Sequence, residues 1–117
     1  MEFLESPVFT RLLHEYLSDD EYRALQVFLA EDPEVGALIP GTGGFRKMRW
    51  TDPRRSKGKR SGLRVIYYYF SEDLQIWFLT IYNKDEADDL TFDQRRMLKA
   101  AIDRETQERA HGRSRRR

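Results

Sequence analysis

The strongest constraint on the fold is a pair of apolar segments separated by a short polar turn. Leu63–Phe70 and Gln75–Tyr82 are dense in β-branched and aromatic side chains, and Ser71–Asp73 between them are polar. Such segments form strands, and so short a connection joins them as an antiparallel hairpin. Phe45–Trp50 predicts a third antiparallel strand, and Phe3-Leu4 is long enough only to add a short fourth.

Two amphipathic helices are predicted before this sheet. Ser6-Pro7 is a typical helix start, with Ser at the N-cap and Pro at the first helical position. Apolar residues then recur at helical spacing to about residue 17. Ser18 and Glu21 have the spacing of a capping box, which begins a second helix that should end near Asp32-Pro33. So tight a connection predicts an antiparallel helical hairpin.

A third helix is predicted after the sheet. Thr91 and Gln94 have capping-box spacing, and the expected inner stripe of the helix is Met97, Leu98, Ala101 and Ile102. The sequence from Arg109 onward carries almost no core residues, so we expect it to fray. We therefore expect one domain over residues 1–110 and a basic flexible tail over 111–117, whose final arginines either touch nucleic acid or are simply solvated.

Together these elements predict an α+β fold, with a helical hairpin packed on a twisted antiparallel sheet of three to four strands and a C-terminal helix. Aromatic residues make up 13% of the chain, too many for a disordered protein. The absence of cysteine excludes disulfides, a thiol nucleophile and cysteine-based metal sites. No apolar run reaches the ~20 residues of a membrane span. The glycine-rich segment Gly36–Gly44 lacks the Gly-Lys-Ser/Thr of a phosphate-binding loop.

Positive charge is concentrated in one stretch of the chain. Residues 44–64 contain nine bases and one acid, whereas residues 1–43 contain nine acids and two bases. Such a field attracts a polyanion to one place and repels it elsewhere. Any single base here could be an ordinary solvated charge, but like charges gathered together cost stability unless an anion binds.

Strand alternation predicts where these charges point. Lys47 and Arg49 share a face of their strand, and Arg46 takes the other. If the strands pair in the simplest register, Arg64, Tyr82 and Lys84 join the first face and form a cationic patch. The basic loop bearing Arg54, Arg55, Lys57, Lys59 and Arg60 would wall it. Phe45, Tyr68 and Tyr82 would supply stacking surfaces, which favours nucleic acid as the ligand.

The order of these features resembles the RelE/HigB toxins of bacterial type II toxin–antitoxin systems. The likeness spans about residues 3–105, and Gly41–Lys47 and Lys57–Gly62 especially resemble the HigB branch. The resemblance implies a cytoplasmic enzyme, monomeric when free, that enters the ribosomal A site and cuts mRNA by attack of a ribose 2′-hydroxyl on the adjacent phosphate. It also implies a cognate antitoxin, expected to contain a helix-turn-helix.

The resemblance further implies roles for individual residues. Arg64 would stabilise the phosphorane-like transition state, and Lys84 would lie near the phosphate or the leaving oxygen. Of Lys47 and Arg49, one would orient the phosphate and the other would assist proton removal. Binding of ribosomal and messenger RNA would fall to Arg46, Arg54, Arg55, Lys57, Lys59 and Arg60.

The identity of the general base stays open. Well-known members carry a tyrosine a few residues after the last-strand basic residue, and here Leu90 and its neighbours supply none, so Tyr82 is a candidate substitute. An arginine holds its proton too tightly for this role, whereas a lysine among other cations can release it.

Two alternatives use the same patch: a non-catalytic RNA-binding module, and a toxin-like interaction protein whose basic face binds an acidic partner. No cofactor, metal or membrane is expected. The acids Asp85, Glu86, Asp88 and Asp89 lack the spacing of a Ca²⁺ loop.

Overall fold

A computed structural model of the chain describes residues 1–50, 62–85 and 89–115. These residues belong to two compact units. The first is formed by residues 1–38 and 45–88, and the second by residues 39–44 and 89–117. Each unit is described by itself.

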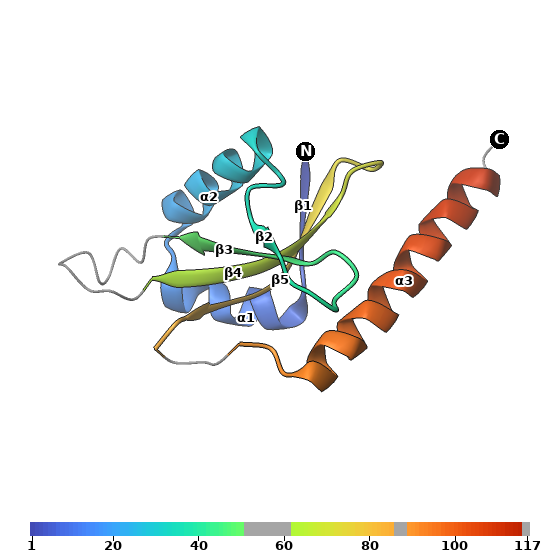
Figure 1. The fold of residues 1–117 in the computed structure, drawn as a ribbon. Helices are drawn as coiled ribbons and strands as arrows, with labels where there is room; N and C mark the ends of the chain where they lie inside the picture. Colours follow the sequence, from blue (N-terminus) through green and yellow to red (C-terminus); the bar gives the residue numbers. More distant parts are fainter. Residues whose placement is uncertain (51–61, 86–88, 116–117) are drawn as a thin grey trace. The chain divides into compact units, whose positions relative to one another are not determined.

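The first unit contains a five-stranded sheet with the order β1-β5-β4-β3-β2 (Figure 1). The strands are β1 (Glu2–Glu5), β2 (Ala37–Leu38), β3 (Arg46–Trp50), β4 (Leu63–Phe70) and β5 (Gln75–Asn83). The predicted α+β fold is confirmed with two differences. Strand β1 pairs with β5 in parallel, and a fifth strand of two residues, β2, forms within the glycine-rich segment Gly36–Gly44.

Helices α1 (Pro7–Tyr16) and α2 (Asp19–Glu31) begin where their capping residues predict. The Ser6 side chain accepts a hydrogen bond from the Phe9 backbone N–H at 3.0 Å. At the second start, the Ser18 hydroxyl accepts from the Glu21 N–H and the Glu21 carboxylate accepts from the Ser18 N–H, which completes the capping box. These reciprocal bonds satisfy donors that a helix start otherwise leaves unpaired.

Both helices pack on one face of the sheet and form the core with it. Phe78 of β5 lies at its centre, with its ring stacked on Phe9 of α1 at 4.6 Å between centroids and on Phe3 of β1 at 5.8 Å. The buried cluster is made of Phe9, Leu13, Leu17, Leu25, Leu29, Met48, Leu63, Val65, Tyr67, Ile76, Phe78 and Ile81. We call this side of the sheet the helix-covered face and the opposite side the open face.

The second unit contains α3 (Phe92–Arg115) and the glycine-rich segment 39–44. The reciprocal bonds between Thr91 and Gln94 confirm the predicted helix start. Gly43 has a φ of +79°, and a Cβ there would lie 2.9 Å from a methyl carbon of Ile102, so only glycine fits at this close approach.

Two expectations for α3 are wrong. Met97 and Ala101, placed in the inner stripe, are exposed, while Leu98 is half-buried and Ile102 is buried. The helix also continues to Arg115, where a frayed tail from Arg109 was expected. In the part of the chain that the structure describes, no helix is long and apolar enough to cross a membrane.

Candidate functional site

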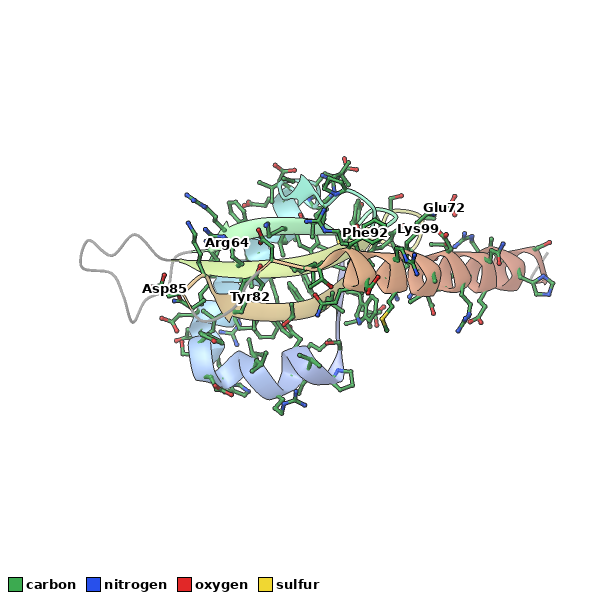
Figure 2. All side chains as sticks on the ribbon, turned by 60° about the horizontal axis from the view of Figure 1, so that its bottom comes forward. Arg64, Glu72, Tyr82, Asp85, Phe92 and Lys99 are labelled. Atoms are coloured by element: carbon green, nitrogen blue, oxygen red, sulfur yellow. The ribbon has the colours of Figure 1, made fainter. Side chains whose placement is uncertain are left out.

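The strand register confirms that Lys47, Arg49, Arg64 and Tyr82 share one face, as predicted. Arg49 of β3 lies directly opposite Arg64 of β4, which lies directly opposite Tyr82 of β5. Directly paired side chains on one face have their Cβ atoms about 4.5–5.5 Å apart. These three residues therefore form a row across the open face, which we call the cationic row. Figure 2 labels Arg64 and Tyr82 on their neighbouring strands.

Lys47 lies one row further along the same face. Its register partner is Ile66, which in turn is paired with Thr80. Side chains two residues apart on a strand point to the same side, so Lys47 and Arg49 both lie on the open face, opposite Ile66 and Arg64 respectively. Lys47 is half-buried, whereas Arg49 is exposed. Three cations from two strands are thus gathered on one side of the sheet.

Arg64 is the most unusual member of the row because it is charged and buried. Its exposed fraction is 8%. Its Nη1 donates two long hydrogen bonds, to the Gly62 carbonyl at 3.4 Å and to the Leu63 carbonyl at 3.5 Å. No acidic side chain among the described residues forms an ion pair with it. A buried charge is costly unless it is paired, so Arg64 is poised to receive an anion.

Lys84 follows β5 immediately. Its side chain is exposed, and its backbone N–H donates to the Gly62 carbonyl at 3.2 Å. The same carbonyl oxygen accepts from Arg64. The chain at Lys84 is therefore fixed next to the start of β4, at the end of the sheet where the cationic row lies.

Arg46, predicted to bind RNA, lies on the helix-covered side of β3. Its guanidinium donates to the carbonyls of Gly36 at 2.8 Å and Glu34 at 3.0 Å, and lies 3.6 Å from the Glu34 carboxylate. The structure does not bring it to the cationic row. The other predicted RNA-binding residues lie outside the described residues: Arg54, Arg55, Lys57, Lys59 and Arg60.

An aromatic group occupies the other end of the open face. The ring of Phe45 lies 5.3 Å from that of Tyr68 and 5.9 Å from that of Trp77. Phe45 is fully buried, so the expectation that it offers a stacking surface to a base is wrong. Tyr68 and Tyr82 remain half-buried.

The buried Tyr67 hydroxyl is engaged in structural contacts. The Tyr67 hydroxyl donates to the Pro33 carbonyl at 2.8 Å and accepts from the Gly36 N–H at 2.9 Å, and burial raises its pKa. Within the described residues, no group of three or more potential ligands gathers to hold a metal ion. Electrostatic binding of an anion is the chemistry that the open face offers.

Sequence reasoning missed two residues next to the site, Gly62 and Asn83. Gly62 supplies the carbonyl shared by Lys84 and Arg64. Asn83 is fully buried at the end of β5. The available signal was the asparagine itself, because strands are depleted in this residue and turns are enriched in it.

Comparisons with known proteins show what the chain is similar to. No protein-family model matches it. A chain of the intact E. coli RelBE toxin–antitoxin complex matches with a TM-score of 0.53 and 14% identity, over 75% of this chain and 98% of that one. A doubly substituted mutant of E. coli toxin RelE in the free state matches with a TM-score of 0.45 and 19% identity, over 68% of this chain and 79% of that one. The particular likeness to the HigB branch stays a prediction. The protein has a RelE-like fold.

Proposed function

We propose that the protein is a ribosome-dependent endoribonuclease toxin that inhibits translation by cleaving mRNA in the ribosomal A site. The observation that carries this proposal is the row of Arg49, Arg64 and Tyr82, with Arg64 buried and without a described acidic partner. The RelE-like fold supports the same function. Phosphodiester chemistry uses such a row because negative charge grows on the phosphate oxygens in the transition state.

The reaction requires no bound metal in this scheme. The ribose 2′-oxygen forms a bond to the adjacent phosphorus as its proton passes to a base, and the bond from phosphorus to the 5′-oxygen breaks as that oxygen gains a proton. The products are a 2′,3′-cyclic phosphate and a free 5′-hydroxyl. Arg64 and Arg49 hold the non-bridging oxygens, and Lys84 lies at the phosphate or the leaving 5′-oxygen.

Lys47 and Tyr82 are the proposed candidates for the base. Both lie on the open face. Tyr82 lies directly opposite Arg64 on β5, and Lys47 lies one row further along on β3. An arginine-rich centre without a strong base still accelerates the reaction, since one positioned donor is worth about 3–4 kcal/mol. Precise placement of the substrate by the ribosome supplies the remainder. Because the ribosome places the substrate, we expect the protein to cleave free RNA only weakly.

The proposal places the protein in the cytoplasm, with the ribosome and a cognate antitoxin as partners. The match to a chain of the RelBE toxin–antitoxin complex supports the antitoxin. We propose a helix-turn-helix in that partner and RNA contacts for the basic loop residues 54–60. A neighbouring small reading frame encoding such a protein would support this pairing.

The decisive experiment is inducible expression of wild type and Arg64→Ala in bacteria, with mapping of mRNA ends. We expect growth arrest and new 5′ ends at ribosome-occupied codons for wild type. For Arg64→Ala we expect a loss of about 100- to 1,000-fold in cleavage on purified translating ribosomes.

Arg23→Ala is the matched control, because this arginine lies on α2 with an exposed ion pair to Asp20. It should cleave as wild type does. Salt-sensitive RNA binding without any cleavage by wild type would instead indicate a non-catalytic RNA-binding module. Undiminished cutting by Arg64→Ala would refute the role given to Arg64.

A further inference from the structure

Asn83 is a polar residue at a core-facing position of a strand. It is paired with Leu63, whose side chain belongs to the buried core, and it is itself fully buried. Valine, isoleucine or leucine is the ordinary choice at such a position, because asparagine is unfavourable in a strand and costly to bury. A polar residue at such an apolar position, next to the proposed site, indicates a functional role.

The side chain of Asn83 forms a turn around the next residue. Its Oδ1 accepts a hydrogen bond from the backbone N–H of Asp85 at 3.0 Å. A bond from an asparagine side chain to the N–H two residues later is an Asx-turn, which fixes the backbone of the residue between them. Here that central residue is Lys84. Figure 2 labels Asp85 just beyond the end of β5.

A second bond fixes Lys84 from the other side. Its N–H donates to the Gly62 carbonyl, which also accepts from the guanidinium of Arg64. A Cβ at Gly62 would lie 3.3 Å from the Trp50 carbonyl oxygen and 3.7 Å from Arg64 Nη1. A side chain at this position would therefore crowd the backbone of β3. One oxygen thus links the backbone of Lys84 to the charged group of Arg64.

We propose that Asn83 is a positioning residue that sets the direction in which the Lys84 ammonium group leaves the sheet, so that it and Arg64 act on the same phosphate. This inference rests on the proposed function and adds to it a residue that does not touch the substrate. Without the Asx-turn, the chain after Tyr82 keeps its strand pairing, but Lys84 samples many directions.

The test uses Asn83→Leu, which is close to asparagine in shape and suits a core-facing strand position, together with Asn83→Ser, whose hydroxyl can accept the same N–H. Single-turnover cleavage is measured on translating ribosomes. A misplacement of about 1 Å can cost ~100-fold in rate, so we expect Asn83→Leu to lower the cleavage rate by about 10- to 100-fold while ribosome affinity and thermal stability are retained. Asn83→Ser should recover most of the rate.

A double-mutant cycle separates positioning from a general loss of structure. In a Lys84→Ala background, Asn83→Leu should cost less than about twofold, because the group that it positions is gone. Equal losses in both backgrounds would overturn the inference, as would full activity of Asn83→Leu. If Asn83→Leu does not fold, Asn83→Ala carries the same comparison without added bulk.

The outcome for wild type keeps the two proposals apart. If wild type cleaves and the cycle shows no coupling, only the role of Asn83 fails. If wild type does not cleave ribosome-bound mRNA, the proposed function fails and the role of Asn83 falls with it.

Discussion

The two faces of the sheet are built from the same strands but differ in what completes them. On β4, Leu63 and Val65 point to the helix-covered face, while Arg64 and Ile66 point to the open face. The covered face is closed by apolar side chains from α1 and α2 of the same chain. The open face holds adjacent cations with no described acid bound to Arg64. The covered face is completed by the chain's own apolar side chains, whereas Arg64 in the cationic row forms no ion pair with an acid among the described residues.

This difference separates stability from function. Burial of apolar surface on the covered face lowers the free energy of the folded state. Like charges directly opposite each other on the open face raise it. Binding of a phosphodiester would offset this like-charge repulsion. Substitutions on the two faces should therefore move stability and activity independently.

The largest effect is expected on the covered face. Phe78→Ala removes a fully buried ring that contacts Phe3, Phe9 and Tyr22. We expect the free energy of unfolding to fall by about 3–5 kcal/mol, because a cavity replaces the ring. Urea denaturation measures the change. The cleavage rate of the fraction that remains folded should be unchanged, and a specific loss of activity in folded protein would break the comparison.

The opposite pattern is expected for Arg49→Ala. Removing this exposed partner of Arg64 should lower cleavage by about tenfold, less than Arg64→Ala does, since solvent weakens its interaction with the phosphate. It should also raise the free energy of unfolding by about 0.2–1 kcal/mol through relief of like-charge repulsion. Thermal unfolding tests the expected gain in stability, and ribosome assays on the same preparation test the expected loss of cleavage. A drop in stability would contradict the view that the cationic row is costly.

A smaller loss of stability is expected at the start of α2. Ser18→Ala removes the hydroxyl that accepts from the Glu21 N–H and breaks the capping box. The expected cost is about 1 kcal/mol in urea denaturation. Ser18→Asp keeps an acceptor and should restore most of it. Cleavage by either variant should match wild type, because the helix lies on the covered face.

The smallest effect at neutral pH concerns Tyr22. Burial, reinforced by its 2.8 Å hydrogen bond to Glu5, raises the pKa of Tyr22 above its ordinary value of 10.0. The unfolded chain loses this proton near pH 10 while the folded chain keeps it. Stability from Tyr22 is thus fully present below pH 10 and falls as the pH rises above it. Urea midpoints between pH 8 and 11 should decline for wild type, and Tyr22→Phe should flatten the slope.

Local signals predicted the elements that local bonds create. The caps at Ser6, Ser18 and Thr91 place their acceptors within three residues of the donors, so a short sequence pattern contains the whole interaction. The hairpin of β4 and β5 is indicated by the short polar turn between two strand-forming segments. The grouping of Arg49, Arg64 and Tyr82 followed from alternation plus an assumed register, and the register has the predicted phase.

Features that depend on distant residues could not be predicted in this way. The pairing shifts between Ile66 and Tyr67, so that Ile66 faces Thr80 and Tyr67 faces Phe78. This irregularity leaves Leu79 unpaired in the β4–β5 register and breaks simple alternation on β5. Likewise, the carbonyl of Gly62 meets Lys84 only after the sheet forms. The burial of Asn83 beside Leu63 of β4 has the same long-range origin.

The parallel pairing of β1 with β5 has a consequence for biosynthesis. Glu2 is in register with Gln75, and the Ser6 hydroxyl donates to the Leu79 carbonyl across 73 positions of sequence. Contacts of such high contact order form late and slowly, and residues 1–6 must wait for the strand that carries Tyr82 to emerge from the exit tunnel. Residues 1–6 therefore reach their native positions only after most of the chain has been synthesised.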